Sequence, residues 1–213
     1  MRHINKGKEP EELTSWKKAN PNSRYEDLDR TEKGRSTRQA IRRAAIKEQF
    51  GLCGYCCIRI DENTSSNEHV ISQQSHKNQT LNFDNIIASC NKKDRCNQQR
   101  GSRNLQLTPL MPECETELKF YLSGKVKGET TRAKKVIEVL ALDNKAIREE
   151  RKNLVDSLLY EEGAKPDAGY LKLLEDELLN YLVTTLDQPD DSGILPPYSP
   201  VLINIIRGFL NTS

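Results

Sequence analysis

The chain has 213 residues, of which 35% are hydrophobic and 30% charged, and its formal net charge is +2. This composition is typical of one or two compact soluble domains, and the sequence has no apolar run long enough to span a membrane. The first residues lack the apolar core of a signal peptide. We therefore expect a cytoplasmic protein whose six cysteines bind metal or remain free thiols.

The charges are distributed unevenly along the chain. Residues 1–103 hold 20 Lys and Arg against 13 Asp and Glu, whereas residues 104–213 hold 13 against 18. Neutralisation of phosphates by basic side chains dominates the affinity of proteins for nucleic acids. The basic half is therefore expected to meet a polyanion such as DNA, and the acidic half a different partner.

The sequence predicts three parts: an irregular N-terminal segment over residues 1–34, a compact unit over 35–104 and a helical part over 105–213. The compact unit begins with a helical pattern over residues 35–50, which ends at a glycine. Its apolar residues share one side, and basic residues cover the rest. The side chains that we expect to contact the DNA backbone are Arg38, Arg42 and Arg43.

Four cysteines then occur as two pairs with the spacing of a metal site. Cys53 and Cys56 form a C-x2-C knuckle, and Cys90 and Cys96 form a C-x5-C pair. Four thiolates so arranged are typical of structural zinc in a tetrahedral site, which ties two loops together where apolar residues are scarce. Cys57 is an alternative ligand to Cys56. Disulfides and unrelated free thiols are the competing explanations.

Polar residues suited to hydrolytic chemistry lie between and beside the cysteine pairs. Glu68 and His69 stand at a short β-like run, and Asn85 begins a second apolar run that leads to the second pair. A helix carrying Asn97 and Arg100 is expected next. We therefore predict an α+β fold that is mainly helical, with a small zinc-stabilised ββα unit.

This segment resembles the HNH endonuclease (ββα-metal) family, in which His69, Asn85 and Asn97 would take the three signature positions. Asn97 departs from the usual third histidine, as in the H-N-N variant. The order of basic segment, C-G-Y-C knuckle and helical half is also similar to the HNH proteins of retron and Septu-type anti-phage defence systems. The resemblance implies a nuclease effector that acts on DNA beside a separate ATPase and, in retrons, a reverse transcriptase with its nucleic acid.

Hydrolysis of a phosphodiester gives each of these residues an expected role. His69, with an ordinary pKa of about 6.5, is the expected general base toward water. Asn97 and Glu68 offer hard oxygen ligands to a catalytic Mg²⁺ or Mn²⁺, as the resemblance also implies. Asn85 is expected to hydrogen-bond the backbone of the loop that holds His69, and Arg100 to clamp a phosphate.

The C-terminal part is expected to be a small helical bundle. Apolar residues recur at helical spacing over residues 133–140, 147–159, 171–186 and 201–210, with a linker rich in Pro, Asp, Gly and Ser before the last. The chain has no P-loop motif. Any dependence on ATP would therefore come from another protein, which we expect to bind this part.

A different class of function also fits these residues: a catalytically inactive zinc module that binds nucleic acid or protein. A thiol redox role for Cys53 and Cys56 is disfavoured, because such chemistry expects a βαβ context. His76 lies in a polar loop, where a second ligand, a phosphate contact and a solvated side chain are alternatives, and we expect the last. Cys114 is expected to be a packed free thiol.

Overall fold

The N-terminal segment, expected to be irregular, contains two short helices that pack on the rest of the molecule. The computed structural model describes residues 1–73, 79–159 and 175–210. Helix α1 (Glu11–Ala19) buries Leu13 and Trp16, and the 3₁₀ helix η1 (Tyr25–Arg30) begins soon after it. Such short helices carry little periodic signal in the sequence. Packing against the next helix supplies most of their stability.

The second helix begins at a polar cap slightly before the expected boundary. Helix α2 (Glu32–Glu48) follows Thr31, whose hydroxyl accepts a hydrogen bond from the Gly34 amide at 3.0 Å. A Cβ at Gly34 would lie 2.3 Å from the carbonyl oxygen of Leu28, so the close approach of η1 requires glycine. The helix buries Ile41 and contacts the first sheet.

The first sheet and a short helix form the centre of the molecule. Strand β1 (Ser65–His69) pairs antiparallel with β2 (Ile86–Cys90), so that His69 lies opposite Ile86. Every residue of β2 is buried, and helix α3 (Cys96–Arg100) follows it and packs against it. The order is strand, strand, helix, and β1 ends at His69, so the apolar residues Val70 and Ile71 that follow lie outside the strand.

The C-terminal part has helices in each of the four places where apolar residues recur at helical spacing. They are α4 (Thr131–Val139), α5 (Lys145–Leu159), α7 (Asp176–Leu186) and α8 (Ser199–Leu210). Residues 171–174, expected to open the third of these helices, lie outside the described residues. Helices α7 and α8 pack side by side.

A β-hairpin that the sequence did not predict precedes these helices. Strand β3 (Leu118–Phe120) pairs antiparallel with β4 (Val126–Gly128), and the 3₁₀ helix η4 (Pro112–Glu115) comes just before them. The turn contains Gly124 with φ of +76°, and a Cβ there would lie 2.0 Å from the carbonyl oxygen of Arg148. Strands of three residues are too short for alternation to predict them.

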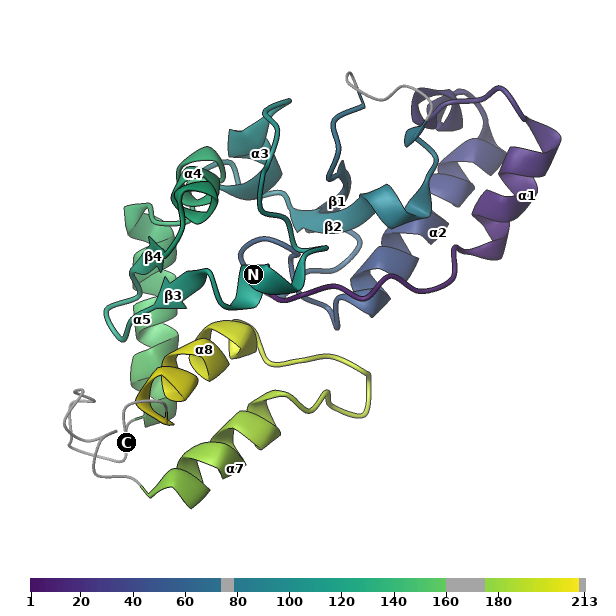
Figure 1. Cartoon of the computed structure of the whole chain (residues 1–213). Helices are drawn as coiled ribbons and strands as arrows, with labels where there is room; N and C mark the ends of the chain where they lie inside the picture. Colours follow the sequence, from purple (N-terminus) through teal and green to yellow (C-terminus); the bar gives the residue numbers. More distant parts are fainter. Residues whose placement is uncertain (74–78, 160–174, 211–213) are drawn as a thin grey trace.

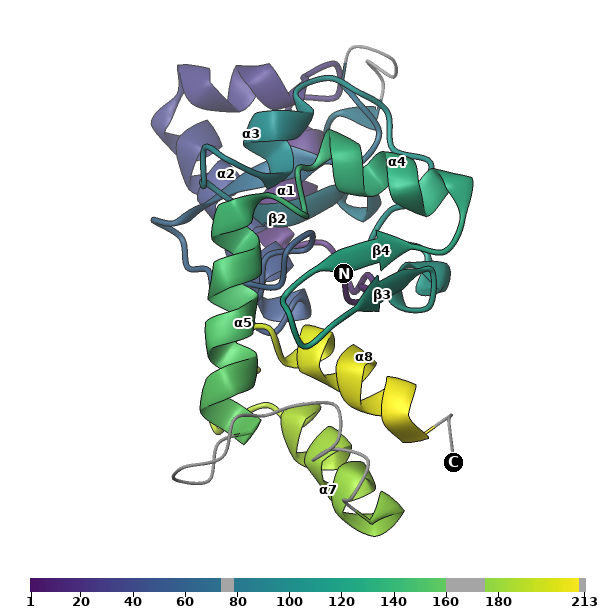
Figure 2. The same ribbon diagram turned by 90° about the vertical axis from the view of Figure 1, so that its left-hand side faces the viewer.

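One continuous hydrophobic core joins the N-terminal and C-terminal parts, from Met1 and Ile87 to Val155 and Ile205. Helices α1 and α2 lie at one end of the molecule, the first sheet and α3 lie in the middle, and α7 and α8 lie at the other end (Figure 1). Helix α8 lies below the β3–β4 hairpin, and α5 runs beside both (Figure 2). No helix within the described ranges is long and apolar enough to cross a membrane.

Candidate metal centre and adjoining polar cluster

Four buried cysteines from three parts of the chain meet beside the first sheet. Cys53 and Cys56 lie in the loop after α2, Cys90 ends β2, and Cys96 begins α3. Each residue is at most 2% exposed, and their sulfur atoms all lie within 4.8 Å of one another. The fold therefore brings the two predicted pairs into a single cluster.

The distances between these sulfurs fit a tetrahedral metal site. The Sγ atoms of Cys53 and Cys96 are 3.9 Å apart, and those of Cys56 and Cys90 are 3.8 Å apart. Tetrahedral zinc with bonds of about 2.3 Å places its sulfurs about 3.8 Å apart, whereas a disulfide bond is only about 2.05 Å long. Burial raises the pKa of the Cys56 and Cys96 thiols, so a bound cation would be needed to keep them ionised. The cluster could hold a metal such as zinc.

The neighbouring Cys57 is buried but lies outside the cluster. Its φ is +64°, its amide donates to the Cys53 carbonyl at 3.0 Å, and its carbonyl accepts from the Tyr198 amide at 2.7 Å. This left-handed conformation turns the chain away after Cys56. Of the two alternatives, Cys56 is therefore the member of the cysteine cluster. Cys114 is a buried free thiol elsewhere in the core.

A glutamine that the sequence analysis overlooked fixes the cysteine knuckle to β2. The Nε2 of Gln49 donates to the carbonyls of Leu52 at 2.7 Å and Ala88 at 2.8 Å. Its Oε1 accepts from the Ala88 amide at 2.7 Å. The amide of Cys90 also donates to the Cys53 sulfur at 3.3 Å. These bonds fix the cysteine loop relative to β2 and so position the sulfur atoms.

His69 is buried at the end of β1 and is oriented through both ring nitrogens. Its Nε2 donates to the carbonyl of Thr80 at 2.8 Å, since a carbonyl can only accept, and this leaves a lone pair on Nδ1. The Gln73 amide donates to Nδ1 at 3.1 Å, and the Tyr25 ring packs edge-on at 4.7 Å between centroids. Burial lowers the pKa of His69, so the ring is neutral near physiological pH. His76 lies outside the described residues.

Asn85 bonds the backbone of the segment that follows His69. Its Oδ1 accepts from the Ile71 amide at 2.7 Å, and its Nδ2 donates to the Ile71 carbonyl at 3.1 Å. The Val70 amide donates to the Asn85 carbonyl at 2.9 Å. Because the oxygen and the nitrogen of its carboxamide both bond the backbone of Ile71, Asn85 holds the segment that follows β1 in place.

Arg100 was expected to clamp a phosphate, but the structure places it in the interior. It is 2% exposed, and its Nη1 donates to Glu68 Oε1 at 2.6 Å and to the His69 carbonyl at 2.8 Å. Its Nη2 donates to the Val70 carbonyl at 2.6 Å, and Tyr55 Oη lies 3.0 Å from Nη1. A guanidinium so engaged cannot also reach a phosphate at the surface. Arg100 instead holds the end of β1 in place through these hydrogen bonds.

Asn97 has the free oxygen that a cation ligand needs. Its Nδ2 donates to Ser66 Oγ at 2.8 Å. Its Oδ1 is buried, with no hydrogen-bond partner in the described part of the chain. A buried carboxamide oxygen without a partner is unfavourable, and such an oxygen is a suitable ligand for Mg²⁺ or Mn²⁺. The donor chemistry of Asn97 therefore fits a hard cation.

The predicted residues lie on two faces of β1. Successive strand residues point to opposite faces, and Glu68 points to α3, where it meets Arg100 and where Asn97 also lies. His69 points to the other face, against Tyr25. The structure therefore brings Glu68 and Asn97 to one face and His69 to the other, with β1 between them. Desolvation raises the pKa of Glu68, and the Arg100 contact opposes that shift.

Two of the arginines expected to contact DNA are engaged within the chain. Arg38 donates to the Asp29 carboxylate, and its guanidinium lies 5.0 Å from the centroid of the Tyr25 ring. Arg42 donates to the Glu62 carbonyl at 2.9 Å. Both side chains brace α2 against neighbouring segments, so neither is freely available to a phosphate.

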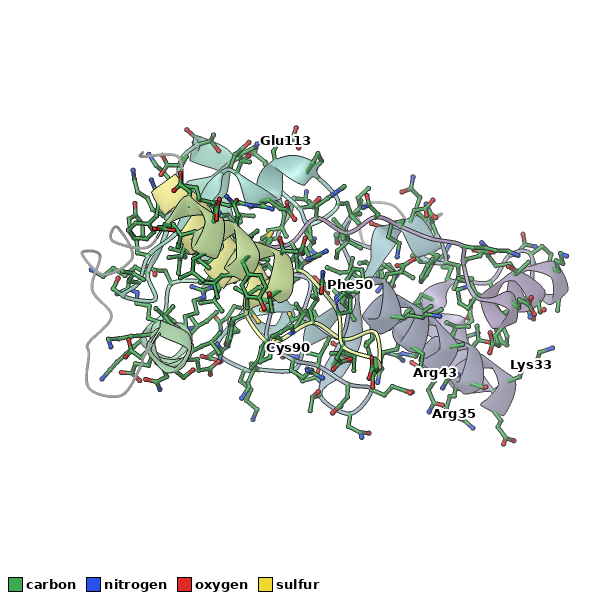
Figure 3. The ribbon with its side chains drawn as sticks, turned by 90° about the horizontal axis from the view of Figure 1, so that it is seen from below. Lys33, Arg35, Arg43, Phe50, Cys90 and Glu113 are labelled. Atoms are coloured by element: carbon green, nitrogen blue, oxygen red, sulfur yellow. The ribbon has the colours of Figure 1, made fainter. Side chains whose placement is uncertain are left out.

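The third arginine, Arg43, lies at the surface of α2. Its side chain is 50% exposed and reaches Glu62 only at 3.4 Å. Lys33, Arg35 and Arg43 lie along this helix (Figure 3), and all three are exposed. We call these three side chains the α2 basic row. Helical spacing turns Lys33 and Arg35 to different sides of α2, and Arg35 also donates to the Asp29 carbonyl at 3.0 Å. Exposed basic side chains of this kind can contact a phosphate backbone.

A comparison of the sequence with known protein families and with curated proteins gives no match. The features of the chain that bear on its function are the cysteine cluster, the polar residues around the end of β1 and the α2 basic row.

Proposed function

We propose that the chain is a metal-dependent endonuclease of the HNH type that hydrolyses phosphodiester bonds in DNA. The observation that carries the proposal is the neutral, oriented ring of His69, with a lone pair on Nδ1. Asn85 holds the backbone two residues further on. A neutral imidazole fixed in one tautomer is the group that general-base catalysis requires.

His69 takes a proton from water at Nδ1, while the Thr80 carbonyl keeps the other ring nitrogen protonated. The water occupies the position in which the Gln73 amide now meets Nδ1 at 3.1 Å. The oxygen of this water forms the new bond to phosphorus. The bond between phosphorus and the 3′-oxygen breaks, and its electron pair stays on the 3′-oxygen. Asn85 keeps the strand end from shifting during this step.

The residues on the opposite face of β1 would hold the catalytic cation. Asn97 would supply its unpaired Oδ1, and Glu68 its carboxylate after exchanging the contact with Arg100. When bound, a divalent cation neutralises charge on the leaving oxygen and polarises the phosphate. Because Glu68 and His69 are consecutive residues at the end of β1, a phosphodiester lying across that end adjoins both faces.

A cleavage assay across a titration of Mg²⁺ and Mn²⁺ tests this proposal. Asn97→Ala should slow DNA cleavage, and excess cation should restore part of the rate, because the substitution weakens the cation and not the base. Asn91→Ala is the matched control, since Asn91 is exposed and uses only its backbone amide in a described hydrogen bond. Equal rates for the two variants at every cation concentration would contradict the assigned ligand.

A second function, a catalytically inactive zinc module that binds nucleic acid, is favoured by two observations. Glu68 is already paired with Arg100, and His69 lies on the other face of the strand. In this case the α2 basic row would bind DNA without cutting it. DNA binding by the wild type with no cleavage at any cation concentration would select this second function.

The setting that we propose is anti-phage defence, in which a separate ATPase binds the acidic part over residues 104–213. Exposed acidic residues at the start of α7, Glu175, Asp176 and Glu177, suit such a contact. Since one core joins both parts, the test uses the full chain. Neutralising these three residues should reduce co-purification with the ATPase, whereas neutralising Glu11 and Glu12 on α1 should not. Equal recovery would place the partner elsewhere.

A further inference from the structure

We propose that the chain has a second ligand site, remote from the cysteine cluster, that binds a small molecule carrying a phosphomonoester. The site is a pocket of about 510 Å³ between the first residues of the chain, the segment from η4 to β3, and α8. Its volume lies within the range of about 300 to 1,000 Å³ typical of small-molecule sites. The N-terminus lies beside β3 and α8 in Figure 1.

The walls of this pocket are fixed by hydrogen bonds between distant segments. Asn204 on α8 accepts from the Phe120 amide at 2.9 Å and donates to the carbonyls of Glu115 at 2.9 Å and Leu118 at 3.0 Å. The Ile4 amide donates to the Pro109 carbonyl at 2.8 Å. The three segments are therefore held in place before any ligand arrives, and preorganisation lowers the cost of binding.

Two of the three cationic side chains that line the pocket are not ion-paired within the described residues. Arg2 pairs with Asp187 at 2.5 Å, and the Glu115 carboxylate accepts from the His3 amide at 2.9 Å. Asp187 is therefore ion-paired, whereas Glu115 is bonded to a neutral donor and keeps its negative charge.

Lys119 and Arg207 are the remaining charged side chains of the lining, and both are exposed. Within the described residues neither forms a salt bridge. Lys119 faces Lys127 across the hairpin, and Lys127 is itself paired with Glu129 at 3.2 Å, so the opposite strand offers Lys119 no carboxylate. Two cations at one recess attract an anion.

The chemistry of these two cations indicates which anion fits. Arg207 presents a planar fork that can donate two hydrogen bonds to one phosphate, and Lys119 adds a compact charge. Together they match the two negative charges of a phosphomonoester. The apolar lining residues Ile203 and Pro200 offer a surface for an organic body next to it. None of these residues belongs to the cysteine cluster or to the polar cluster, so the inference is independent of the proposed nuclease.

Isothermal titration calorimetry of the full chain tests the proposal with three probes: adenosine 5′-monophosphate, inorganic phosphate and adenosine. We expect the monophosphate to bind more tightly than phosphate, and adenosine not to bind measurably. Lys119→Gln and Arg207→Gln should each weaken the monophosphate roughly tenfold, since each removes a charge-assisted contact. Lys125→Gln is the matched control, because Lys125 is an exposed hairpin lysine outside the pocket lining.

Three results would overturn the proposal. Absence of any measurable binding of the monophosphate and of phosphate would remove the site. Adenosine binding as tightly as its monophosphate would show that the cations do not recognise the ligand. Inorganic phosphate binding as tightly as the monophosphate would show that the apolar wall does not contribute. Circular dichroism of each variant confirms that lost binding does not reflect lost structure.

Discussion

The guanidinium of Arg95 forms a bidentate ion pair with the carboxylate of Glu150, with nitrogen–oxygen distances of 3.0 and 2.5 Å. Arg95 is 1% exposed and directly precedes Cys96 of the cysteine cluster, whereas Glu150 lies on α5. Tyr198, just before α8, donates its hydroxyl to the same carboxylate. The segment that carries the cysteine cluster is therefore bonded to α5 and to the residue that precedes α8.

Replacing Glu150 should destabilise the whole chain. Glu150→Ala leaves Arg95 buried without its carboxylate, and we expect a loss of about 2 to 3 kcal/mol in the free energy of unfolding, at the lower end for buried pairs because the Glu150 side chain is 33% exposed. Chemical denaturation measures this loss. Glu149→Ala, at an exposed neighbouring position, should change stability by less than about 0.5 kcal/mol. Similar losses in both variants would contradict the assigned role.

The same pair should make stability depend on pH on the acid side. Burial opposes ionisation of Glu150, but hydrogen bonds from Arg95 and Tyr198 outweigh it and hold its pKa below the ordinary value of 4.5. A lowered folded-state pKa gives a contribution that is present above the unfolded value and is lost as pH falls through the folded value. The stability difference between wild type and Glu150→Ala should therefore shrink as pH falls below 4.5. A difference that stays constant or grows would count against the pair.

Metal content should distinguish two adjacent cysteines. Cys56→Ser removes a member of the cluster, so we expect the variant to lose its zinc and to aggregate or unfold, because such sites fold with their metal. Cys57→Ser changes a buried thiol outside the cluster and should keep the metal. Elemental analysis of purified protein measures both. A wild-type chain that is folded and soluble without bound metal would contradict the site.

The sequence predicts this centre well because cysteine spacing is a local signal. The C-x2-C and C-x5-C pairs and the apolar run of β2 each occupy a few neighbouring residues. The sequence does not predict the hydrogen bonds and ion pairs by which distant residues hold this centre in place. Gln49 is bonded to Ala88 across 39 positions, and Arg95 to Glu150 across 55. Neither residue has a motif of its own, since only the folded chain brings the partners together.

Loss of the Asn85 side chain should loosen the end of β1. Asn85→Ala leaves the amide and the carbonyl of Ile71 without partners, which should cost about 1 to 3 kcal/mol. Hydrogen exchange at the Ile71 amide should become faster. Asn85→Asp is the matched variant, because its carboxylate can still accept from that amide. Unchanged exchange in Asn85→Ala would show that the carboxamide does not hold this segment.

DNA affinity should depend on Arg43 more than on Arg38. Arg43→Gln should reduce the slope of log affinity against log salt by about one, the change expected when one phosphate contact is removed. Arg38→Gln should have a smaller effect on that slope, because Arg38 is paired with Asp29 and packed on Tyr25. Binding measured over a range of salt concentrations compares the two. Equal slopes for wild type and Arg43→Gln would exclude the α2 basic row as the DNA contact.

The candidate site shows where prediction from the sequence reaches its limit. Sequence order placed Glu68, His69 and Asn97 in one cluster, but β1 ends at His69, and strand alternation sends Glu68 and His69 to opposite faces. The burial of Arg100 could not be predicted either, because its acceptors are mostly backbone carbonyls. Thr80 orients His69 through its backbone carbonyl, and a backbone contact of this kind cannot be predicted from a pattern of side chains.

A substitution of Gln73 tests whether water must reach Nδ1 of His69 in the proposed catalytic step. Its amide occupies His69 Nδ1 at 3.1 Å, where the proposed mechanism requires water. Gln73→Ala should therefore cleave DNA at least as fast as the wild type, with the same dependence on cation. Steady-state cleavage rates measure this. A loss of activity as large as that of a His69 substitution would show that Gln73 takes part in the reaction.

The most direct test of the nuclease assignment is the rate of DNA cleavage by His69→Ala in Mg²⁺ or Mn²⁺, compared with the wild type. Metal content and circular dichroism serve as folding controls, since His69 is not a member of the cysteine cluster. If His69 is the general base, the variant stays folded and loses roughly 10² to 10⁴-fold in rate, and excess cation does not restore it. If His69→Ala cuts like the wild type while a chelator still abolishes cleavage, the base lies elsewhere and the proposed mechanism is wrong.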